Sequence, residues 1–142
     1  MKKELQEKYI ELQILDQTIK QIQQQLSILD QQLFELQNLN EDLEEVSKVK
    51  PDSDILTPLG AGVFIKTQLK DNKEILMKVG SNVVAKKTIE ESKNIINEEL
   101  QKIKSTISEM EKEITNATIT ATNIQEEIKD MMSKEDNPIT SN

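Results

Sequence analysis

Apolar residues recur every three or four positions through most of this 142-residue chain. In residues 4–46 they fill the a and d positions of a single heptad register, in which only Lys8 and Asn40 are polar. Apolar a and d positions sustained over several heptads predict a coiled-coil helix. The apolar positions are Leu5, Leu12, Leu15, Ile19, Ile22, Leu26, Leu29, Leu33, Leu36 and Leu43.

A second heptad stretch begins after residue 87. Thr88 followed by Glu91 has the spacing of a capping box, in which the Thr hydroxyl accepts from the amide three residues later. The heptad then runs from Ile89 to Met131, with Lys93 as its one charged core position. This pattern predicts a second coiled-coil helix of about the same length as the first.

Two features define where these helices continue and where they end. Pro51 cannot continue a helix, so we expect the first helix to end near residues 48–50. Residues 115–123 are rich in threonine, which is a poor helix former. Ala117 and Ala121 nevertheless keep the heptad there, so the second helix is predicted to continue through this stretch.

The two heptad stretches match in register when they are counted outward from the segment between them. This predicts one antiparallel coiled coil, with both chain ends at its far tip. The expected facing pairs are Leu43–Ile89, Leu36–Ile96, Leu29–Ile103 and Leu15–Ala117. Asn40 and Lys93 then lie side by side near the intervening segment. They either fix the register, as polar a residues do, or mark where the helices begin to splay.

The intervening segment, residues 51–87, reads as β structure. Short β-prone runs alternate with turn residues, which predicts two consecutive β-hairpins. The expected strands are 55–59, 63–69, 74–79 and 83–87, with turns at Gly60-Ala61-Gly62, Asp71-Asn72 and Gly80-Ser81-Asn82. Isolated hairpins are marginally stable, and their edges offer unpaired backbone groups to other chains. The segment is therefore predicted to be an oligomerisation site that joins an intermolecular sheet or barrel. Its expected contact residues are Ile55, Leu56, Val63, Phe64, Ile65, Leu69, Ile75, Met77, Val79, Val83 and Val84.

Composition narrows the possible functions. The net charge is −8, all 18 basic residues are lysine, and histidine and cysteine are absent. Arginine is the usual residue for phosphate and base contacts, so an acidic chain without it is a poor nucleic-acid or membrane binder. Histidine and cysteine are the commonest general base and thiolate ligand. We therefore expect no enzyme activity, no cofactor and no metal. The paired glutamates lie on exposed helix faces and are expected to be solubilising, not acid–base pairs.

These patterns together predict an α+β fold that is mostly α. Its expected parts are a coiled-coil helix over 1–50, two β-hairpins over 51–87, a second helix over 88–134 and a disordered tail over 135–142. The start MKKELQEKYIE lacks the apolar stretch of a signal peptide, and no apolar run is long enough to span a membrane. A cytoplasmic location is the expectation.

At residues 55–92 the chain resembles a known family. ILTPLGAGVFIKTQLKDNKEILMKVGSNVVAKK between two heptad helices looks like the α subunit of archaeal prefoldin. The shared motifs are the P-x-G-A-G turn, the F-I-K strand, the L-K-D hairpin turn and the V-G between the third and fourth strands. Two hairpins are typical of the α class, and one of the β class. The resemblance implies a hexamer of two α and four β subunits, in which the hairpins join an intermolecular β-barrel platform. This hexamer captures unfolded proteins at coiled-coil tips without ATP. It would pass these clients to a group II chaperonin.

Apolar residues at the predicted tip are the candidates for client contact. Most lie off the heptad core or close its end. They are Met1, Leu5, Tyr9, Ile10, Ile14, Ile119, Ile128, Met131 and Met132. Ile28, Phe34 and Ile95 lie nearer the hairpins and are expected to pack against them or a neighbouring subunit. The alternatives are a coiled-coil scaffold or tether without clients and, less favoured, an accessory domain of an enzyme.

Overall fold

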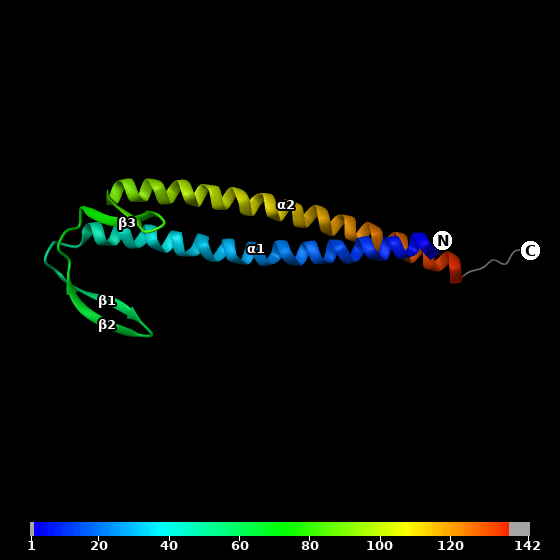
Figure 1. Ribbon diagram of the computed structural model, residues 1–142, viewed down its shortest axis with the longest axis horizontal. Helices are drawn as coiled ribbons and strands as arrows, with labels where there is room; N and C mark the ends of the chain where they lie inside the picture. Colours follow the sequence, from blue (N-terminus) through cyan, green and yellow to red (C-terminus); the bar gives the residue numbers. More distant parts are fainter. Residues whose placement is uncertain (1, 137–142) are drawn as a thin grey trace, which may run out of the picture. The chain divides into compact units, whose positions relative to one another are not determined.

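The computed structural model describes residues 2–136, which form two long helices joined by four strands (Figure 1). The helices are α1 (Lys2–Lys48) and α2 (Ile89–Asp136), and the strands are β1 (Asp54–Gly60), β2 (Val63–Gln68), β3 (Glu74–Gly80) and β4 (Val83–Thr88). The predicted α+β fold is confirmed. The chain divides into two compact units: a strand unit, Gln32–Ile103, and a terminal unit, Met1–Gln31 with Lys104–Asn142.

The strand unit is held together by a narrow apolar core between its helical segments. Leu43, Ile89, Ile96 and Leu100 are buried and form one cluster. Leu33, Leu36 and Val46 pack against this cluster from α1. The predicted heptad residues therefore do form the seam. The helical segments here run antiparallel, because successive contacts move up α1 as they move down α2.

The polar heptad residues Asn40 and Lys93 each pair with a residue of the opposite helix. The Asn40 side-chain amide donates to the Asn97 carbonyl oxygen at 3.2 Å. Lys93 forms an ion pair with Glu44. Asn40 and Lys93 were predicted to lie side by side, whether they fix the register or mark a splay. In the structure each pairs with a different residue instead. A polar layer of this kind favours one register over its neighbours at some cost in stability.

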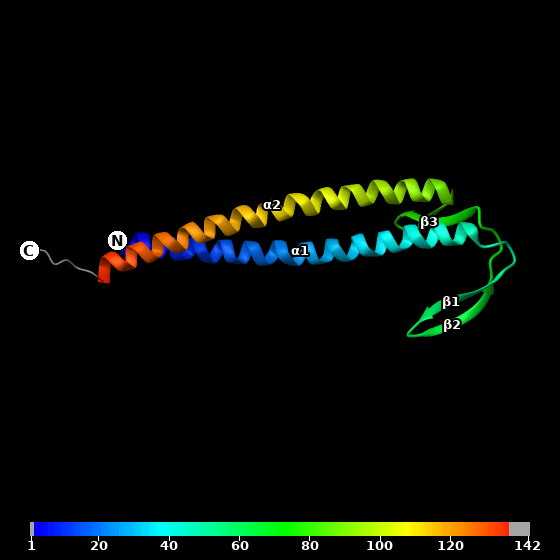
Figure 2. The ribbon, with the colours of Figure 1, turned by 180° about the vertical axis from the view of Figure 1, so that it is seen from behind.

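In the terminal unit, α1 and α2 again lie side by side (Figures 1 and 2). Ala121, Ile124 and Ile128 are buried in this seam. The threonine-rich stretch is helical as predicted, and three of its hydroxyls donate to the carbonyl four residues earlier. These bonds run from Thr115 to Glu111, from Thr120 to Asn116 and from Thr122 to Thr118. Packing in the seam, where Ala121 is buried, explains why poor helix formers stay helical here.

The four strands form two separate antiparallel hairpins, β1–β2 and β3–β4. The β3–β4 hairpin packs on the helices through Ile75 and Met77, which contact the core cluster. Its strand β4 leads directly into α2, where Thr88 caps the helix by accepting from the Glu91 amide at 3.0 Å. The predicted N-cap is therefore confirmed.

The prediction of a hairpin turn at Asp71-Asn72 is wrong. Strand β2 pairs with β1 and β3 with β4, so these residues connect two hairpins instead of closing one. The Asn72 side-chain amide donates to the carbonyls of Ser47 and Val49, at 3.2 and 3.0 Å. The last carbonyls of a helix have no partner within it. Asn72 supplies that partner for α1, a role that only the folded chain reveals.

Replacing Asn72 by alanine is expected to lower the free energy of unfolding by about 1 kcal/mol, because two carbonyl acceptors lose their donor. Asn72→Asp has nearly the same size but brings a carboxylate to these carbonyl oxygens, so it is expected to destabilise at least as much. Urea unfolding followed by circular dichroism measures both. An Asn72→Asp variant as stable as the wild type would contradict the assigned role.

Candidate interaction surfaces

The terminal unit carries a set of exposed apolar side chains, which we call the tip set. Its members are Tyr9, Ile10, Ile14, Ile119 and Met132, which are 44–57% exposed. A half-exposed isoleucine outside the seam contributes little to holding the helices together, because most of its surface stays in water. These five residues are therefore available for contact with another molecule. Met1, also predicted for this set, lies outside the described residues.

The other predicted tip residues belong partly or wholly to the seam. Leu5 and Met131 are half-buried. Ile128 is only 6% exposed. An outside molecule reaches Ile128 only when the two helices separate, so this residue differs from the exposed isoleucines.

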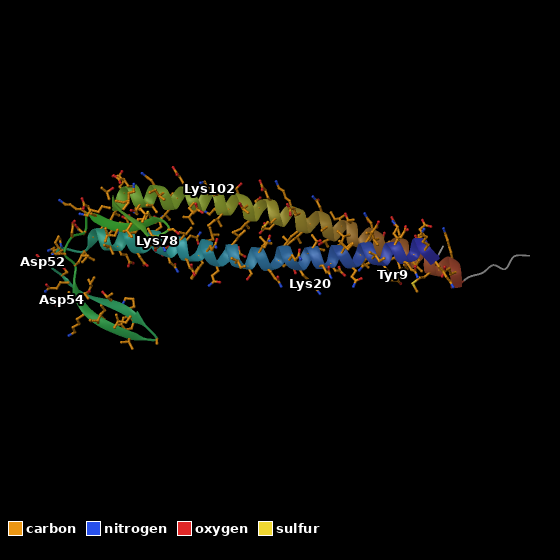
Figure 3. The ribbon with its side chains drawn as sticks, in the orientation of Figure 1. Tyr9, Lys20, Asp52, Asp54, Lys78 and Lys102 are labelled. Carbon is orange, nitrogen blue, oxygen red and sulfur yellow. The ribbon has the colours of Figure 1, made fainter. Side chains whose placement is uncertain are left out.

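Polar contacts join the two helices within the tip set. The Tyr9 hydroxyl lies 3.4 Å from the Met132 sulfur and donates to it. Figure 3 shows Tyr9 on α1. Lys8, at a d position of the heptad, forms an ion pair with Glu127 at 2.7 Å and a longer one with Glu11 at 3.9 Å. The hydrogen bond to Glu127 raises the pKa of Lys8 above its ordinary value. A charged residue thus occupies a seam position by pairing across it.

The strand unit presents a second apolar surface on its hairpins. Among the predicted contact residues, those exposed are Leu56, Val63, Phe64, Ile65, Val79, Val83 and Val84, while Ile55, Leu69, Ile75 and Met77 are half-buried. Leu59 is 67% exposed and was not among the predicted contacts. It lies at the end of β1, where the register with β2 shifts, so strand alternation does not indicate its exposure.

A groove of about 430 Å³ lies beside β3 in the strand unit. Its lining residues are Leu36, Leu39, Met77, Lys78, Val79, Ile95, Ile96 and Glu99. Ile95, predicted to pack near the hairpins, is in this lining, whereas Phe34 is 63% exposed. Leu39 falls outside the a and d positions, so the heptad pattern did not indicate it.

Within residues 2–136 no three His, Cys, Asp or Glu side chains are grouped so that they could hold a metal ion. None of the described helices has an apolar stretch long enough to cross a membrane.

Comparison with known proteins identifies the family. The model of the family described as "Prefoldin subunit" matches residues 15–133. The chain belongs to the prefoldin family. The match covers most of both helices and all four strands, so it rests on the complete described architecture.

Similar proteins from archaea support the resemblance to the α class. Proteins named prefoldin subunit alpha from Methanococcus maripaludis and Methanococcus vannielii are each 32% identical over 71 residues. That region is 50% of this chain and 47% of each relative, so the match spans about half the length of these relatives. The predicted resemblance to the prefoldin α subunit is confirmed.

A solved structure shows the same fold. The filamentous PFD from Methanocaldococcus jannaschii, determined by cryo-electron microscopy, superposes with a TM-score of 0.74. The superposition covers 84% of this chain and 98% of that chain, at 17% sequence identity. The two chains thus share a fold at low sequence identity.

The seam charge at Lys8 gives a pH-dependent prediction. A raised pKa in the folded chain means that the Lys8 pair stabilises the fold below the unfolded pKa, and that this contribution is lost as the pH rises through the folded pKa. Between pH 8 and pH 11 the unfolding temperature is therefore expected to fall further for the wild type than for Lys8→Leu.

At pH 8 the Lys8→Leu variant is expected to melt about 2 °C higher than the wild type, because leucine suits a d position. Lys20→Leu is the matched control, since Lys20 lies on the exposed face of the same helix (Figure 3). Equal pH dependence of the wild type and Lys8→Leu would show that the pair does not stabilise the fold.

Proposed function

We propose that this chain is a subunit of a prefoldin-type co-chaperone, which captures unfolded proteins without ATP and passes them to a group II chaperonin. The observation that carries the proposal is the tip set of the terminal unit. Five apolar side chains remain about half exposed on a helical pair whose seam is already filled. Ile10, Ile14 and Ile119 are more than half exposed and add little to the seam, so binding another molecule is the task that fits them best.

The chemistry of the tip set suits clients of varied sequence. Isoleucine, methionine and tyrosine offer apolar area without a fixed hydrogen-bond pattern, and methionine adapts its shape to different partners. Unfolded proteins expose apolar side chains in many arrangements. An adaptable apolar surface binds them with modest affinity per contact and little sequence preference, as a holding chaperone requires.

Net charge supports the same function. The chain carries −8 overall, and exposed apolar surface on a weakly charged protein promotes self-association. Repulsion between like-charged copies keeps such a protein dispersed while its apolar residues stay available. The acidic surface therefore allows the tip set to remain exposed at cytoplasmic concentrations, and we place the protein in the cytoplasm.

Assembly is assigned to the hairpins. Each hairpin is a two-stranded sheet, so both of its edges carry backbone groups without a strand partner in the same sheet. Exposed apolar side chains such as Phe64 and Ile65 lie on β2. Pairing with hairpins of other subunits would cover both features. We propose prefoldin β subunits as these partners, in a hexamer of two α and four β chains.

A structural scaffold without clients is the alternative function. A scaffold needs helix pairs whose outer faces are polar or covered by a fixed partner. Ile10, Ile14 and Ile119 are more than half exposed, which favours client binding. The two functions differ in whether these isoleucines matter for suppressing aggregation.

The tip set is tested with Ile10→Ser, Ile14→Ser and Ile119→Ser combined in one chain. Co-assembled with a prefoldin β subunit, the triple variant is expected to lose most of its suppression of aggregation of a denatured model protein, at least about fivefold by light scattering. The loss is expected because each substitution removes the exposed half of an isoleucine side chain from the apolar surface. Suppression would be measured without nucleotide.

Ile28→Ser is the matched control. Ile28 is 58% exposed on the same unit but lies outside the tip set. It is expected to retain suppression. A triple variant that suppresses aggregation as well as the Ile28 variant would favour the scaffold function.

Assembly is tested with Phe64→Ser and Ile65→Ser together. Because the two side chains point to opposite faces of β2, both faces of the hairpin lose apolar surface. The double variant is expected to remain unassembled with β subunits, as judged by mass from light scattering. Gln68→Ser, on the same strand, serves as control. A hexamer mass for the double variant would refute assembly through this hairpin.

A further inference from the structure

The two hairpins repeat one sequence pattern at a spacing of 20 residues. Both begin with an acidic residue, Asp54 or Glu74, and both reach a glycine just before the turn. Identical residues occupy five matching positions. They are Ile55 and Ile75, Leu56 and Leu76, Gly60 and Gly80, Val63 and Val83, and Lys66 and Lys86.

Strand pairing repeats in the same way. Ile55 faces Thr67 in the first hairpin, and Ile75 faces Lys87 in the second. Each hairpin has one register shift, which falls immediately before Gly60 in the first and Gly80 in the second. Matching sequence positions therefore occupy matching places in the two ribbons. A side chain that faces the helices in one hairpin has a counterpart on the same face of the other.

The two copies are nevertheless packed differently. In β3–β4, Ile75 and Met77 lie against an apolar surface on the helices, which we call the helix seat. The helix seat consists of Leu33, Leu36, Leu43, Val46, Ile89, Ile96 and Leu100. Leu76, between the two inward residues, points away and is 69% exposed. One face of the second hairpin is thus covered by the helices of its own chain.

The corresponding face of the first hairpin differs at the central position. Thr57 stands where the second hairpin has Met77. The Thr57 and Thr67 hydroxyls lie 2.6 Å apart and share a hydrogen bond, so this face carries a polar pair. Placing that pair on an apolar surface would remove it from water without new partners. Methionine at the same place adds flexible apolar contact instead.

We propose that the two hairpins are copies of one module that fit the same helix seat, and that methionine at position 77, against threonine at position 57, selects the second copy for it. The first copy is thereby left free for another chain. The availability of the first copy for another chain rests on the proposed assembly function, whereas the selection of the second copy does not.

Chain connectivity allows either copy to reach the seat. The first hairpin is joined to α1 by residues 49–53, and five extended residues span at most roughly 17 Å. Packed helices lie about 8–10 Å apart, so this link is long enough to bring the hairpin across them. The second hairpin has no link, since β4 ends at Thr88 and α2 begins at Ile89. Side-chain chemistry and this direct connection both favour the second copy.

Hydrogen exchange of the 142-residue chain, read by mass spectrometry, tests the selection. Met77→Thr is expected to speed exchange of the amides of residues 75–87 about tenfold, because a half-buried apolar side chain leaves the seat. Leu76→Thr is the matched control on the same strand and is expected to change exchange less than about twofold. Met77→Leu, which keeps the apolar volume, is expected to retain protection.

Unchanged exchange in residues 104–136 shows that the terminal unit stays folded in each variant. Equal exchange rates in Met77→Thr and Leu76→Thr would overturn the role of Met77.

A chain with both Thr57→Met and Met77→Thr tests whether the copies are interchangeable. The amides of residues 55–67 are expected to exchange at least about threefold more slowly than in the wild type, as the first hairpin takes the seat. Exchange in 55–67 that stays at the wild-type rate would show that the first hairpin does not fit.

These measurements need no partner and no client. Their failure is therefore distinct from failure of the proposed function, which the assembly mass of the Phe64 and Ile65 variant decides.

Discussion

The narrowness of the apolar seam between the two helices determines the rest of this structure. Two helices in contact bury one stripe of each, and the fully buried apolar residues all lie on such stripes. Such a seam leaves no wide interior for a sheet to cover. The strands consequently remain as two-stranded ribbons, and only one of them, through Ile75 and Met77, extends the core of the strand unit.

Polar residues within the seam have different effects in the two units. In the strand unit, Asn40 and Lys93 each pair across it, so a slipped register would bury them without partners. In the terminal unit, Lys8 crosses the seam to Glu127 and replaces the apolar contact that a d residue would make. Each pair replaces some apolar contact and so lowers stability. The pairs also favour one register, whereas a seam of leucine and isoleucine alone defines the register weakly.

Much of the fold could be predicted because the heptad pattern is local and repeats. The helices, the Thr88 cap and the strands all follow from residues close together in the sequence. The turn at Asp71-Asn72 was predicted wrongly because a connection between hairpins uses the same residue types as a turn within one. The contacts of Asn72 with the end of α1 depend on tertiary structure, which no local pattern encodes. For the same reason the sequence did not indicate that Leu39 lines the groove or that Leu59 is exposed.

For the candidate surfaces, the sequence could identify apolar residues outside the heptad but not their exposure. Ile10, off the heptad core, and Ile128, at an a position that closes the seam, were both predicted client contacts, yet one is 55% exposed and the other 6%. The difference follows from which face of the helix meets its partner. A chain that buries so little must leave apolar residues exposed, and most of those described lie on the hairpins and in the tip set. Because a narrow seam cannot bury these residues, it leaves surface for the assembly and the capture that we propose.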